Sequence, residues 1–392
     1  MNFLSNFELM AKKRILFFDT IIDGHHLPYF RYIIEYFKEK DSYEIYLASN
    51  QDLKGHLSHY YPTGFPTKFI HFIAIQSKQI DQFHSKNILF RSLSEWNYFV
   101  RMGEDLQIDF GVLPYFDTYQ FGAMIGHKPK FQVSGILFRA INPLNPPSFY
   151  DHLKVSIVKR LFNKPYINRL YFLDESVANS YQEISKSSFP ICDPINFYNP
   201  DYIENLNCFK LPKKNHKIRF GLVGQIDNRK GIEYFIQACK NLNKEDLNQI
   251  QLVIMGLTKK DYQDQLTNLF KSVPDLEIYT QYEWLEDECL EFGLYHTDIV
   301  LALYKNHLGS SSILVKAAYY QKPVLGSHQG LMGKNIQFYN LGLTVNPVDL
   351  EELKVAIQKI IKGDFRINKE GMRKFAQKNS IQEFGKTLEN GF

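Results

Sequence analysis

Short apolar runs alternate with longer amphipathic stretches along the first half of the chain. Runs typical of buried strands occupy residues 14–20, 43–48, 69–75, 110–115 and 131–138. Apolar positions at helical spacing fill 27–40 and 80–106, with a weaker helix near 52–60 and a basic helix from residue 149. Strands that alternate with helices form βαβ units, so the pattern predicts an α/β domain around a parallel sheet.

The alternation stops and then begins again in the second half of the chain. Residues 187–215 lack periodicity, carry four prolines and end in a basic cluster, which is typical of a linker. Strand-like runs follow at 217–224, 251–255, 276–279, 298–304 and 323–327. The pattern predicts two Rossmann-like, doubly wound domains at 11–204 and 205–379, with residues 1–10 as an N-terminal extension.

Parallel sheets bind ligands beyond the carboxyl ends of their strands, so the loops after the strands are the candidate sites. After the first strand the chain reads Asp23-Gly24-His25-His26. Glycine allows close backbone approach to a ligand, and histidine is the usual proton carrier near neutral pH, so His26 is a candidate catalytic residue. The adjacent histidines can equally cap the helix that follows.

A carboxylate stands after another strand of the same domain. Asp117 follows the apolar run at 110–115. Because a positioned carboxylate can exchange a proton with a bound substrate, Asp117 is the second candidate catalytic residue. The alternative is that Asp117 caps a helix over 118–125, and the sequence leaves both interpretations open.

The first strand of the second half ends in a loop suited to an anion. The segment contains Gly224 and Gln225, then Arg229, Lys230 and Gly231, where a helix is predicted to begin. A helix N-terminus points backbone N–H groups at an incoming anion, and the two cations add charge at the same place. We therefore expect phosphate binding, with an exposed basic turn as the alternative.

A second loop of the same domain has similar chemistry. Gly309, Ser310, Ser311 and Ser312 lie between the strand at 298–304 and a helix over 313–318. Their N–H and hydroxyl groups can donate to phosphate oxygens, whereas a plain helix cap needs only one serine. Two such loops in one domain predict a diphosphate held between them.

Composition argues against a nucleic-acid binder, a cysteine metal site and a membrane-spanning protein. The 46 Lys and Arg against 42 Asp and Glu give a net charge of +4, too little to indicate a nucleic-acid binder. The four cysteines form no metal-ligand spacing, and no apolar run approaches the roughly 18 residues of a membrane span. No Asp-x-Asp pair follows a strand, so no metal or other cofactor is expected. These features predict a cytoplasmic protein.

The helix predicted over residues 149–169 is strongly basic. It carries Lys154, Lys159, Arg160, Lys164 and Arg169 against the single acid Asp151, with Leu153, Ile157 and Leu161 as an apolar stripe. Such a helix can lie on an anionic membrane surface, which would make the protein peripheral on the inner face of the membrane. The alternative is that the stripe packs on the domain core and the cations are solvated.

The chain at this point resembles the GT-B glycosyltransferases, specifically the retaining family 4 (group 1) enzymes that use nucleotide-sugar donors. Residues 224–232 are similar to the family's first donor loop, in which a Lys-Gly pair follows a Gly-Arg pair. Residues 298–323, 330–333 and 341–345 are similar to its donor-side helix, its Lys-Pro-Val strand and its closing glycine loop. Asp193-Pro194 falls where the family enters its second domain.

The resemblance implies two domains with a cleft between them and a C-terminal helix, 380–392, that returns to the first domain. It implies that the two C-terminal loops bind the donor diphosphate and that Asp23, Gly24 and His25 face the acceptor. Gln225 replaces the family's usual arginine, a charge that Arg229 can supply. The family's paired glutamates are absent, since the positions hold Leu308 and Lys316. An ammonium only donates hydrogen bonds, so Lys316 is expected near the diphosphate or paired with a neighbouring acid.

The function expected is transfer of a sugar from a nucleotide-diphosphate sugar to a glycan, a lipid-linked glycan or another acceptor. Retention is implied by resemblance alone. One alternative is a nucleotide-sugar 2-epimerase on the same fold, which would need more carboxylates than the predicted loops contain. Another is a non-catalytic binding protein derived from such an enzyme, as the missing glutamates would allow.

Overall fold

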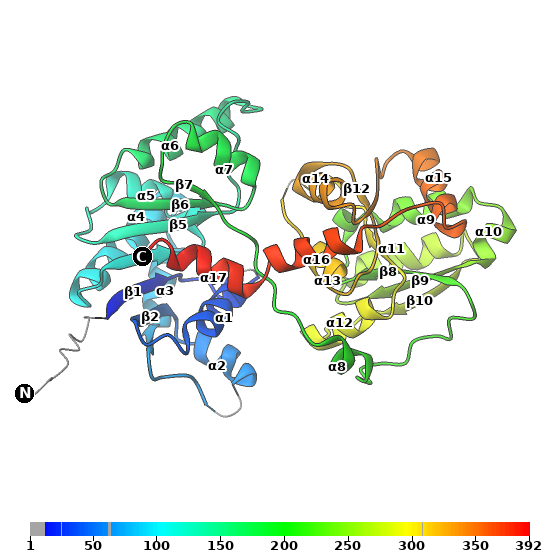
Figure 1. Cartoon of the computed structure of the whole chain (residues 1–392), viewed down its shortest axis with the longest axis horizontal. Coiled ribbons are helices and arrows are strands. Elements are labelled where there is room, and N and C mark those ends of the chain that lie inside the picture. The colour runs from blue at the N-terminus through cyan, green and yellow to red at the C-terminus, as the bar shows by residue number, and fades with distance from the viewer. Residues whose placement is uncertain (1–11, 25, 62–63, 308) are drawn as a thin grey trace, which may run out of the picture. The chain divides into compact units, whose positions relative to one another are not determined.

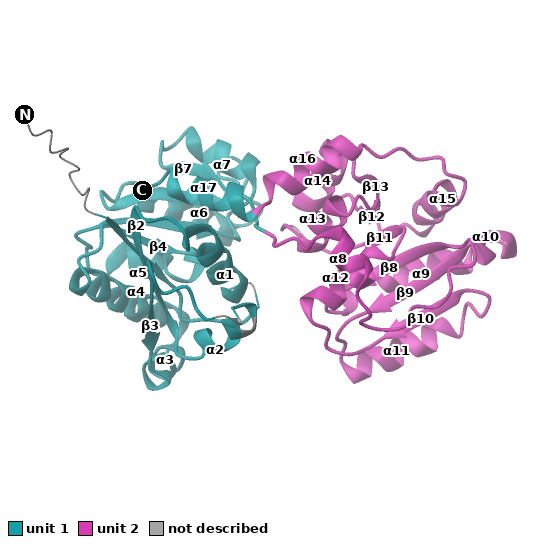
Figure 2. Cartoon of the chain, turned by 60° about the horizontal axis from the view of Figure 1, so that its bottom comes forward, with its two compact units in different colours: residues 1–194, 381–392 teal, residues 195–380 magenta. Residues whose placement is uncertain are grey.

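The computed structural model of the chain, drawn in Figure 1, describes residues 12–24, 26–61, 64–307 and 309–392. Two compact units are present (Figure 2): unit 1 runs to Pro194 and includes Ile381–Phe392, and unit 2 comprises Ile195–Ser380. No helix among the described residues combines the length and apolar character needed to cross a bilayer. The predicted pair of doubly wound parallel-sheet domains is confirmed.

Unit 1 is built on a seven-stranded sheet with the strand order β3-β2-β1-β4-β5-β6-β7. Its strands are β1 (Lys13–Phe18), β2 (Tyr43–Asn50), β3 (Ile70–Ile75), β4 (Phe110–Leu113), β5 (Gln132–Leu137), β6 (Ile167–Phe172) and β7 (Ser188–Pro190). The inner strand β1 pairs in parallel with β2 and β4, and its residues 15–18 are fully buried, which explains their unbroken apolar run. The strand order reverses between β1 and β4, the position where such sheets bind ligands.

Helices cover both faces of this sheet. One core cluster is shared by α3 (Ser77–His84), α4 (Ile88–Asp105), α5 (Gln120–Ile125), α6 (Phe149–Phe162) and α7 (Glu175–Gln182). The opposite cluster is shared by α1 (His26–Phe37), α2 (Leu53–Leu57) and α17 (Ile381–Glu389). The unit also contains two short 3-10 turns, η1 (Ser58–Tyr60) after α2 and η2 (Phe116–Thr118) after β4. Figure 1 shows α17, in red, against α1. The end of the sequence therefore completes the fold of the first unit.

Unit 2 is built on a six-stranded parallel sheet with the order β10-β9-β8-β11-β12-β13. Its strands are β8 (Ile218–Val223), β9 (Ile250–Met255), β10 (Glu277–Gln281), β11 (Ile299–Ala302), β12 (Val324–Ser327) and β13 (Gly342–Val345). The order reverses between β8 and β11, and the two predicted phosphate loops follow these two strands. Both loops therefore lie at the position where ligands bind in open α/β sheets.

Helices again cover both faces. One cluster holds α9 (Ile232–Lys240), α10 (Lys244–Asn248), α11 (Lys260–Phe270) and α15 (Leu350–Ile361). The other holds α8 (Pro200–Glu204), α12 (Asp287–Tyr295), α13 (Ser312–Tyr319), α14 (Gly330–Tyr339) and α16 (Lys369–Lys378). A 3-10 turn, η3 (Asn228–Lys230), lies in the first loop.

The division between the units lies ten residues before the predicted boundary at 204/205. The reason is α8, which the sequence assigned to a linker but which packs on α12. Ile203 is fully buried in the core of unit 2, and the hydroxyl of Tyr295 donates to Glu204 at 3.3 Å. The proline-rich segment therefore contains ordered structure, including strand β7 of unit 1 and helix α8 of unit 2. The extension predicted for residues 1–10 lies outside the described residues.

Two further details differ from the sequence prediction. The long helix expected over 80–106 is two helices, because Asn87 caps α4 by accepting a hydrogen bond from the Phe90 N–H at 3.1 Å. Cys208 and Cys289 form a disulfide, which ties the segment after α8 to α12. Nothing in the sequence pattern pointed to this pairing, since the two residues are 81 positions apart.

Candidate functional site

The loop after β8 is held tightly against the end of β11. Gly231 has φ +67°, and a Cβ added there would lie 2.1 Å from the carbonyl oxygen of Leu303. The N–H of Lys305 donates to the carbonyl of Arg229 at 2.8 Å. Gly224, with φ +99°, begins the loop. Glycine at position 231 is thus required both by its backbone angle and by the close approach of another strand.

The two cations of this loop have different surroundings. Lys230 is buried, and its Nζ donates to the carbonyl of Val223 at 2.8 Å. An ammonium has three donors, so this bond fixes the group and leaves donors for an anion. Arg229 is half-exposed and lies 3.7 Å from Asp227, while Gln225 is exposed. The loop therefore offers one buried positive charge, on Lys230, and one partly exposed positive charge, on Arg229.

The serine loop leads directly into α13. Ser311 is the N-cap residue, but its hydroxyl makes no capping hydrogen bond to the helix. Ser312 is exposed, and Gly309 and Ser310 are half-buried. The carbonyl of Ser310 accepts a hydrogen bond from His307 Nε2 at 2.8 Å. Uncapped N–H groups at a helix N-terminus favour an anion.

Tyr304 connects the two loops, and the sequence pattern did not identify it. Its ring centre lies 5.2 Å from Lys230 Nζ and 5.9 Å from the guanidinium carbon of Arg229. Its hydroxyl oxygen accepts from the hydroxyl of Ser311 at 3.3 Å. The sequence shows Tyr304 only as the last residue of an apolar run. Its role depends on contacts with two loops that are distant in the sequence.

Lys316 is paired with a buried acid. Its Nζ lies 2.8 Å from Oε1 of Glu291 on α12, and the other oxygen of Glu291 accepts from the hydroxyl of Tyr320. Glu291 is 1% exposed and the Lys316 side chain 17%. Burial and the neighbouring Glu291 raise the pKa of Tyr320. Of the partners considered from sequence, the structure shows the acid, and contact of Lys316 with a diphosphate stays a prediction.

The loop after β1 places His26 beside a buried carboxylate. Nδ1 of His26 lies 2.6 Å from Oδ2 of Asp19, which is 1% exposed. Gly24 has φ +61°, and Asp23 is exposed with its carbonyl accepting from the His26 N–H at 3.3 Å. His25 lies outside the described residues. The structure therefore gives His26 a carboxylate partner that sequence reasoning missed.

Asp117 lies in η2 and joins two loops of unit 1. Its oxygens accept from the N–H groups of Phe138 at 2.8 Å and Arg139 at 3.0 Å. Burial raises the pKa of the Asp117 carboxyl, against the opposing effect of these two hydrogen bonds. Both oxygens thus hold the loop after β5 in place. The catalytic role of Asp117 stays a prediction.

A second buried carboxylate, Glu95 on α4, lies near the same end of β1. One of its oxygens accepts from the hydroxyl of Thr20 at 2.7 Å and from Arg91 Nε at 3.1 Å. Burial raises the pKa of Glu95, and the contacts with Thr20 and Arg91 oppose that shift. The sequence pattern gave no reason to select Glu95, because its partner Thr20 is 75 positions away.

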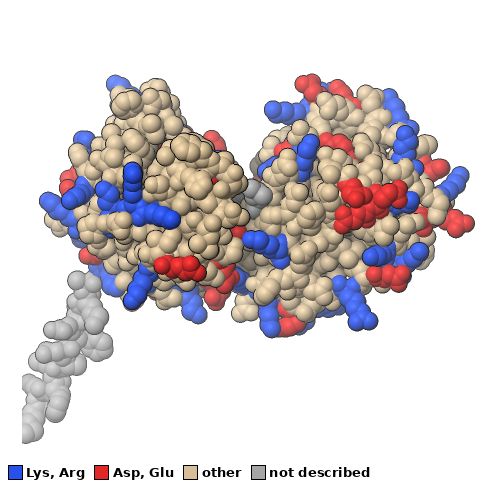
Figure 3. Space-filling view, turned by 90° about the horizontal axis from the view of Figure 1, so that it is seen from above, with Lys and Arg blue, Asp and Glu red and all other residues tan. Residues whose placement is uncertain are grey.

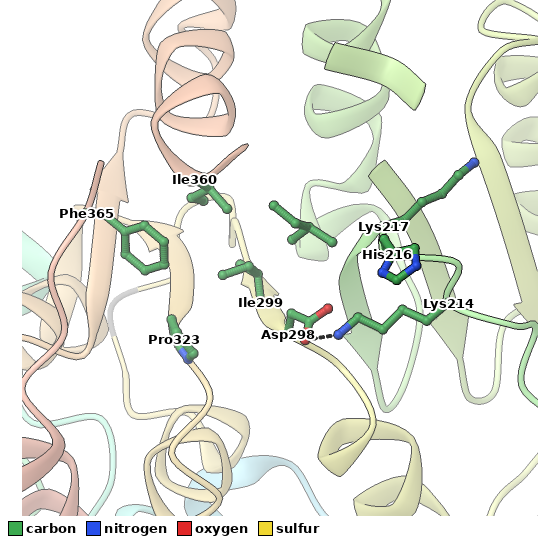
Figure 4. Close-up of a pocket in the computed structure, with 9 residues that line it drawn as sticks. Lys214, His216, Lys217, Asp298, Ile299, Pro323, Ile360 and Phe365 are labelled. Atoms are coloured by element: carbon green, nitrogen blue, oxygen red, sulfur yellow. Dashed lines mark hydrogen bonds and ion pairs between the residues drawn. The ribbon is translucent and has the colours of Figure 1, made fainter. Parts of the chain in front are cut away.

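A groove of about 510 Å³ lies at the amino ends of the unit 2 strands, whereas the two predicted phosphate loops lie at the carboxyl ends (Figure 4). Lys214, His216 and Lys217 border one side, and Ile360 and Phe365 border the other. Its cations are paired, Lys214 with Asp298 at 2.6 Å and Lys217 with Glu277 at 2.9 Å. The groove adjoins the amino ends of β8, β11 and β12, so it is separate from the phosphate loops. Within the described ranges, no cluster of three or more His, Cys, Asp or Glu side chains could hold a metal ion.

Known proteins resemble the chain in fold over almost its whole length. Sucrose-phosphate synthase from Thermosynechococcus elongatus has a TM-score of 0.68 at 15% identity, covering 97% of this chain and 98% of that chain. Anabaena HepE in complex with UDP and glucose has a TM-score of 0.65 at 14% identity, covering 96% and 98%. A glycosyltransferase from Rickettsia africae has a TM-score of 0.65 at 15% identity, covering 97% and 98%. At these identities the likeness is one of fold.

Sequence similarity to a known family covers most of unit 2. No curated protein matches the chain in sequence. Residues 204–379 match the family model described as Glycosyl transferases group 1, a range that contains both phosphate loops and Tyr304. The two parallel-sheet units thus form a GT-B fold, and the second of them is similar in sequence to the group 1 glycosyl transferases.

Proposed function

We propose that the protein transfers a sugar from a nucleotide-diphosphate sugar to a glycan or lipid-linked acceptor. The observation that carries this proposal is the meeting of two anion-type loops at Tyr304, at the switch point of the unit 2 sheet. The HepE structures of the same fold are complexes with UDP and with UDP-glucose. By this analogy the loops of unit 2 bind the diphosphate of a nucleotide-sugar.

Lys230 and Arg229 would stabilise the negative charge that develops on the leaving diphosphate. Because two protein cations are available for this task, we propose that the reaction needs no metal ion. Retention of the anomeric configuration is proposed from the family resemblance alone. The metal proposal predicts unchanged activity after treatment with EDTA, and a loss that added Mg²⁺ or Mn²⁺ restores would contradict it.

One assay separates the proposed activity from its alternatives. Incubation with a panel of nucleotide-sugars and acceptors, followed by measurement of free nucleoside diphosphate, should show acceptor-dependent release. An epimerase would change the sugar of the donor without needing an acceptor, and a binding protein would retain the nucleotide-sugar unchanged. If no donor in the panel is consumed while one is bound, the transferase proposal fails.

Removal of the fixed cation should weaken nucleotide binding. A charge-assisted bond to phosphate contributes roughly 1.5–3 kcal/mol, so Lys230→Met should raise the Kd for UDP by about tenfold or more. Methionine keeps the buried aliphatic stem, which limits any effect on folding. Calorimetry measures the affinity, with Lys240→Met, an exposed lysine at the end of α9, as the matched control. Equal affinity in the parent and Lys230→Met would remove this loop from the donor site.

We also propose that unit 1 contacts an anionic membrane surface through the start of α6. Leu161 of this helix is fully buried in the unit 1 core and Ile157 packs against that core, so part of the predicted stripe packs inward. Phe149 and Leu153 instead face outward, 86% and 52% exposed. The view in Figure 3 shows Lys and Arg side chains standing on this unit among large uncharged areas. Exposed apolar side chains on a basic helix favour the boundary of an anionic bilayer.

Vesicle binding tests this surface. The protein should sediment with vesicles of phosphatidylcholine and phosphatidylglycerol more than with pure phosphatidylcholine. Phe149→Ser combined with Leu153→Ser should reduce that binding, because it removes the apolar contact. Phe338→Ser is the matched control, since Phe338 on α14 is 82% exposed and lies on unit 2. Equal sedimentation of parent and double variant would contradict the proposal.

A further inference from the structure

The disulfide between Cys208 and Cys289 joins two parts of unit 2 that are distant in the sequence. Cys208 lies between α8 and β8, where residues 205–217 form no helix or strand, and Cys289 lies in the first turn of α12. Both residues are partly exposed. Because thiol–disulfide exchange requires access to a sulfur atom, a reductant in solution can reach this bond.

The surroundings of the other cysteines restrict such exchange in unit 2 to this pair. Cys239 is fully buried in the core on α9, and burial raises the pKa of its thiol, so the reactive thiolate is disfavoured there. Cys192 belongs to unit 1. The sequence predicts a cytoplasmic protein, and disulfides that form in that compartment are mostly transient and redox-sensing.

Noncovalent contacts hold the same two segments together beside the disulfide. The hydroxyl of Tyr202 donates to Glu288 of α12 at 2.6 Å. The ring of Phe209, next to Cys208, packs edge-on against Phe292 of α12 with ring centres 5.3 Å apart. These contacts do not depend on the oxidation state of the cysteines. The two thiols therefore stay close after reduction, and the bond can form again.

The helix that carries Cys289 also supports the serine loop. Glu291, two residues further along α12, lies 2.8 Å from Lys316 of α13 and accepts from the hydroxyl of Tyr320 on the same helix. The serine loop forms the N-terminus of α13. A binding loop that is already held in place pays less ordering entropy when its ligand arrives. Loss of the covalent tie to α12 should therefore weaken binding at this loop.

We propose that Cys208 and Cys289 are a redox switch, which a dithiol reductant opens and a disulfide oxidant closes, and that opening weakens nucleotide binding to unit 2. A reductant thiolate attacks one sulfur, and the other cysteine leaves as a thiolate. The second thiol of the reductant then releases the first cysteine, so the protein gains two electrons and two protons while the reductant becomes a disulfide. Closure is the reverse reaction. The effect on binding rests on the proposed transferase function, whereas the redox chemistry does not.

Limited digestion with trypsin tests the bond itself. Lys210 and Lys213 are exposed between Cys208 and β8, so a cut there separates Cys208 from Cys289 along the chain. After treatment with oxidised glutathione, the nicked protein should run as one band without reductant and as two bands with it. Reduction by dithiothreitol before digestion should speed the cut severalfold, because the segment opens locally more often. Two bands without reductant would overturn the proposal.

Calorimetry on the full chain tests the effect of the bond. Dithiothreitol should lower the unfolding temperature of unit 2 by about 5 °C or more, since the bond closes a long loop of the unfolded chain. The Kd for UDP should rise by about fivefold or more, as is usual for coupled sites. Oxidised glutathione should reverse both changes. Cys208→Ser combined with Cys289→Ser should match the reduced parent, and Cys192→Ser, the matched control, should respond to dithiothreitol as the parent does.

The outcomes separate the two levels of the proposal. An equal Kd for UDP in the oxidised and reduced parent would make the bond structural and overturn the switch. A double variant that still responds to dithiothreitol would overturn its assignment to this pair. A chain that binds no nucleotide in either state overturns the proposed function and the effect on binding together. The gels and the unit 2 transition then still decide whether the bond opens reversibly.

Discussion

Lys316 stands on α13 where the group 1 resemblance implies a glutamate, and its ammonium neutralises the buried Glu291 at 2.8 Å. Loss of one partner from a buried ion pair leaves a charge in a medium of low polarity, which costs about 3–5 kcal/mol. The lysine therefore has a structural task whether or not it also reaches a phosphate.

A reversal of the Lys316 charge should destabilise unit 2. Lys316→Glu places a second carboxylate beside Glu291, so the free energy of unfolding measured in urea should fall by about 3 kcal/mol or more. The double variant Lys316→Glu with Glu291→Lys should recover part of that loss. UDP affinity is then measured on the folded fraction, where a further loss would show a direct contact with the diphosphate. A single variant as stable as the parent would mean that Lys316 is solvated.

How far a residue's role could be predicted depended on how local its contacts are. Gly224 to Gly231 form one strand-loop-helix segment, so the chemistry of Lys230 could be inferred from the sequence around it. Tyr304 contacts two loops, and Glu95 meets Thr20 across 75 positions, so only the fold reveals their roles. Asp19 is seven positions from His26, but their contact depends on how the chain leaves β1 and enters α1.

Apolar periodicity predicted most strands and helices within a few residues, since burial on one face or on both determines it. It failed where a polar side chain or a tertiary contact decides the element. Asn87 divides the long helix into α3 and α4, and α8 forms because Ile203 packs into the core of unit 2. A single capping residue and a single tertiary contact leave no repeating pattern of apolar residues, so periodicity could not reveal either feature.

A substitution at Gly231 tests how tightly the predicted phosphate loop after β8 must pack against the end of β11. Gly231→Ala introduces a strained backbone angle, worth about 1–2 kcal/mol, and places a Cβ 2.1 Å from a carbonyl oxygen. Gly363→Ala is the matched control, because Gly363 has a similar φ of +71° with nothing within 4 Å of its Cβ. Urea denaturation should therefore show a larger loss for Gly231→Ala, and only this variant should weaken UDP binding. Equal losses with unchanged affinity would show that the loop can move away from β11.

At the scale of the whole molecule, the chain leaves unit 1 after Pro194, forms unit 2 and returns at Ile381. Phe384 and Leu388 of α17 are fully buried in the core cluster of α1. Glu389 accepts hydrogen bonds from Tyr36 at 2.5 Å and from Lys40 at 2.6 Å. The last helix is therefore a structural part of unit 1.

Removal of residues 381–392 should destabilise unit 1 selectively. Each buried Phe or Leu side chain contributes about 1.5–3 kcal/mol, so the calorimetric transition of unit 1 should move to lower temperature. The transition of unit 2 should stay where it is. Gly385→Ala should lower the transition temperature of unit 1 by a smaller amount while keeping the chain at full length, because a Cβ there would lie 2.0 Å from the ring of Tyr36. An equal shift of both transitions would contradict this assignment of α17.

The return of the chain at Ile381 also determines the order in which the units can mature on the ribosome. Unit 2 is continuous, so residues 195–380 can fold as soon as they have left the exit tunnel. Unit 1 begins to emerge first but lacks α17 until residues 381–389 have been made, and until then the apolar surface of α1 that Phe384 and Leu388 cover lies open. Of the two units, unit 1 is thus the first to begin synthesis and the second to be completed. Until α17 is in place, its exposed apolar surface is the kind of surface that chaperones bind.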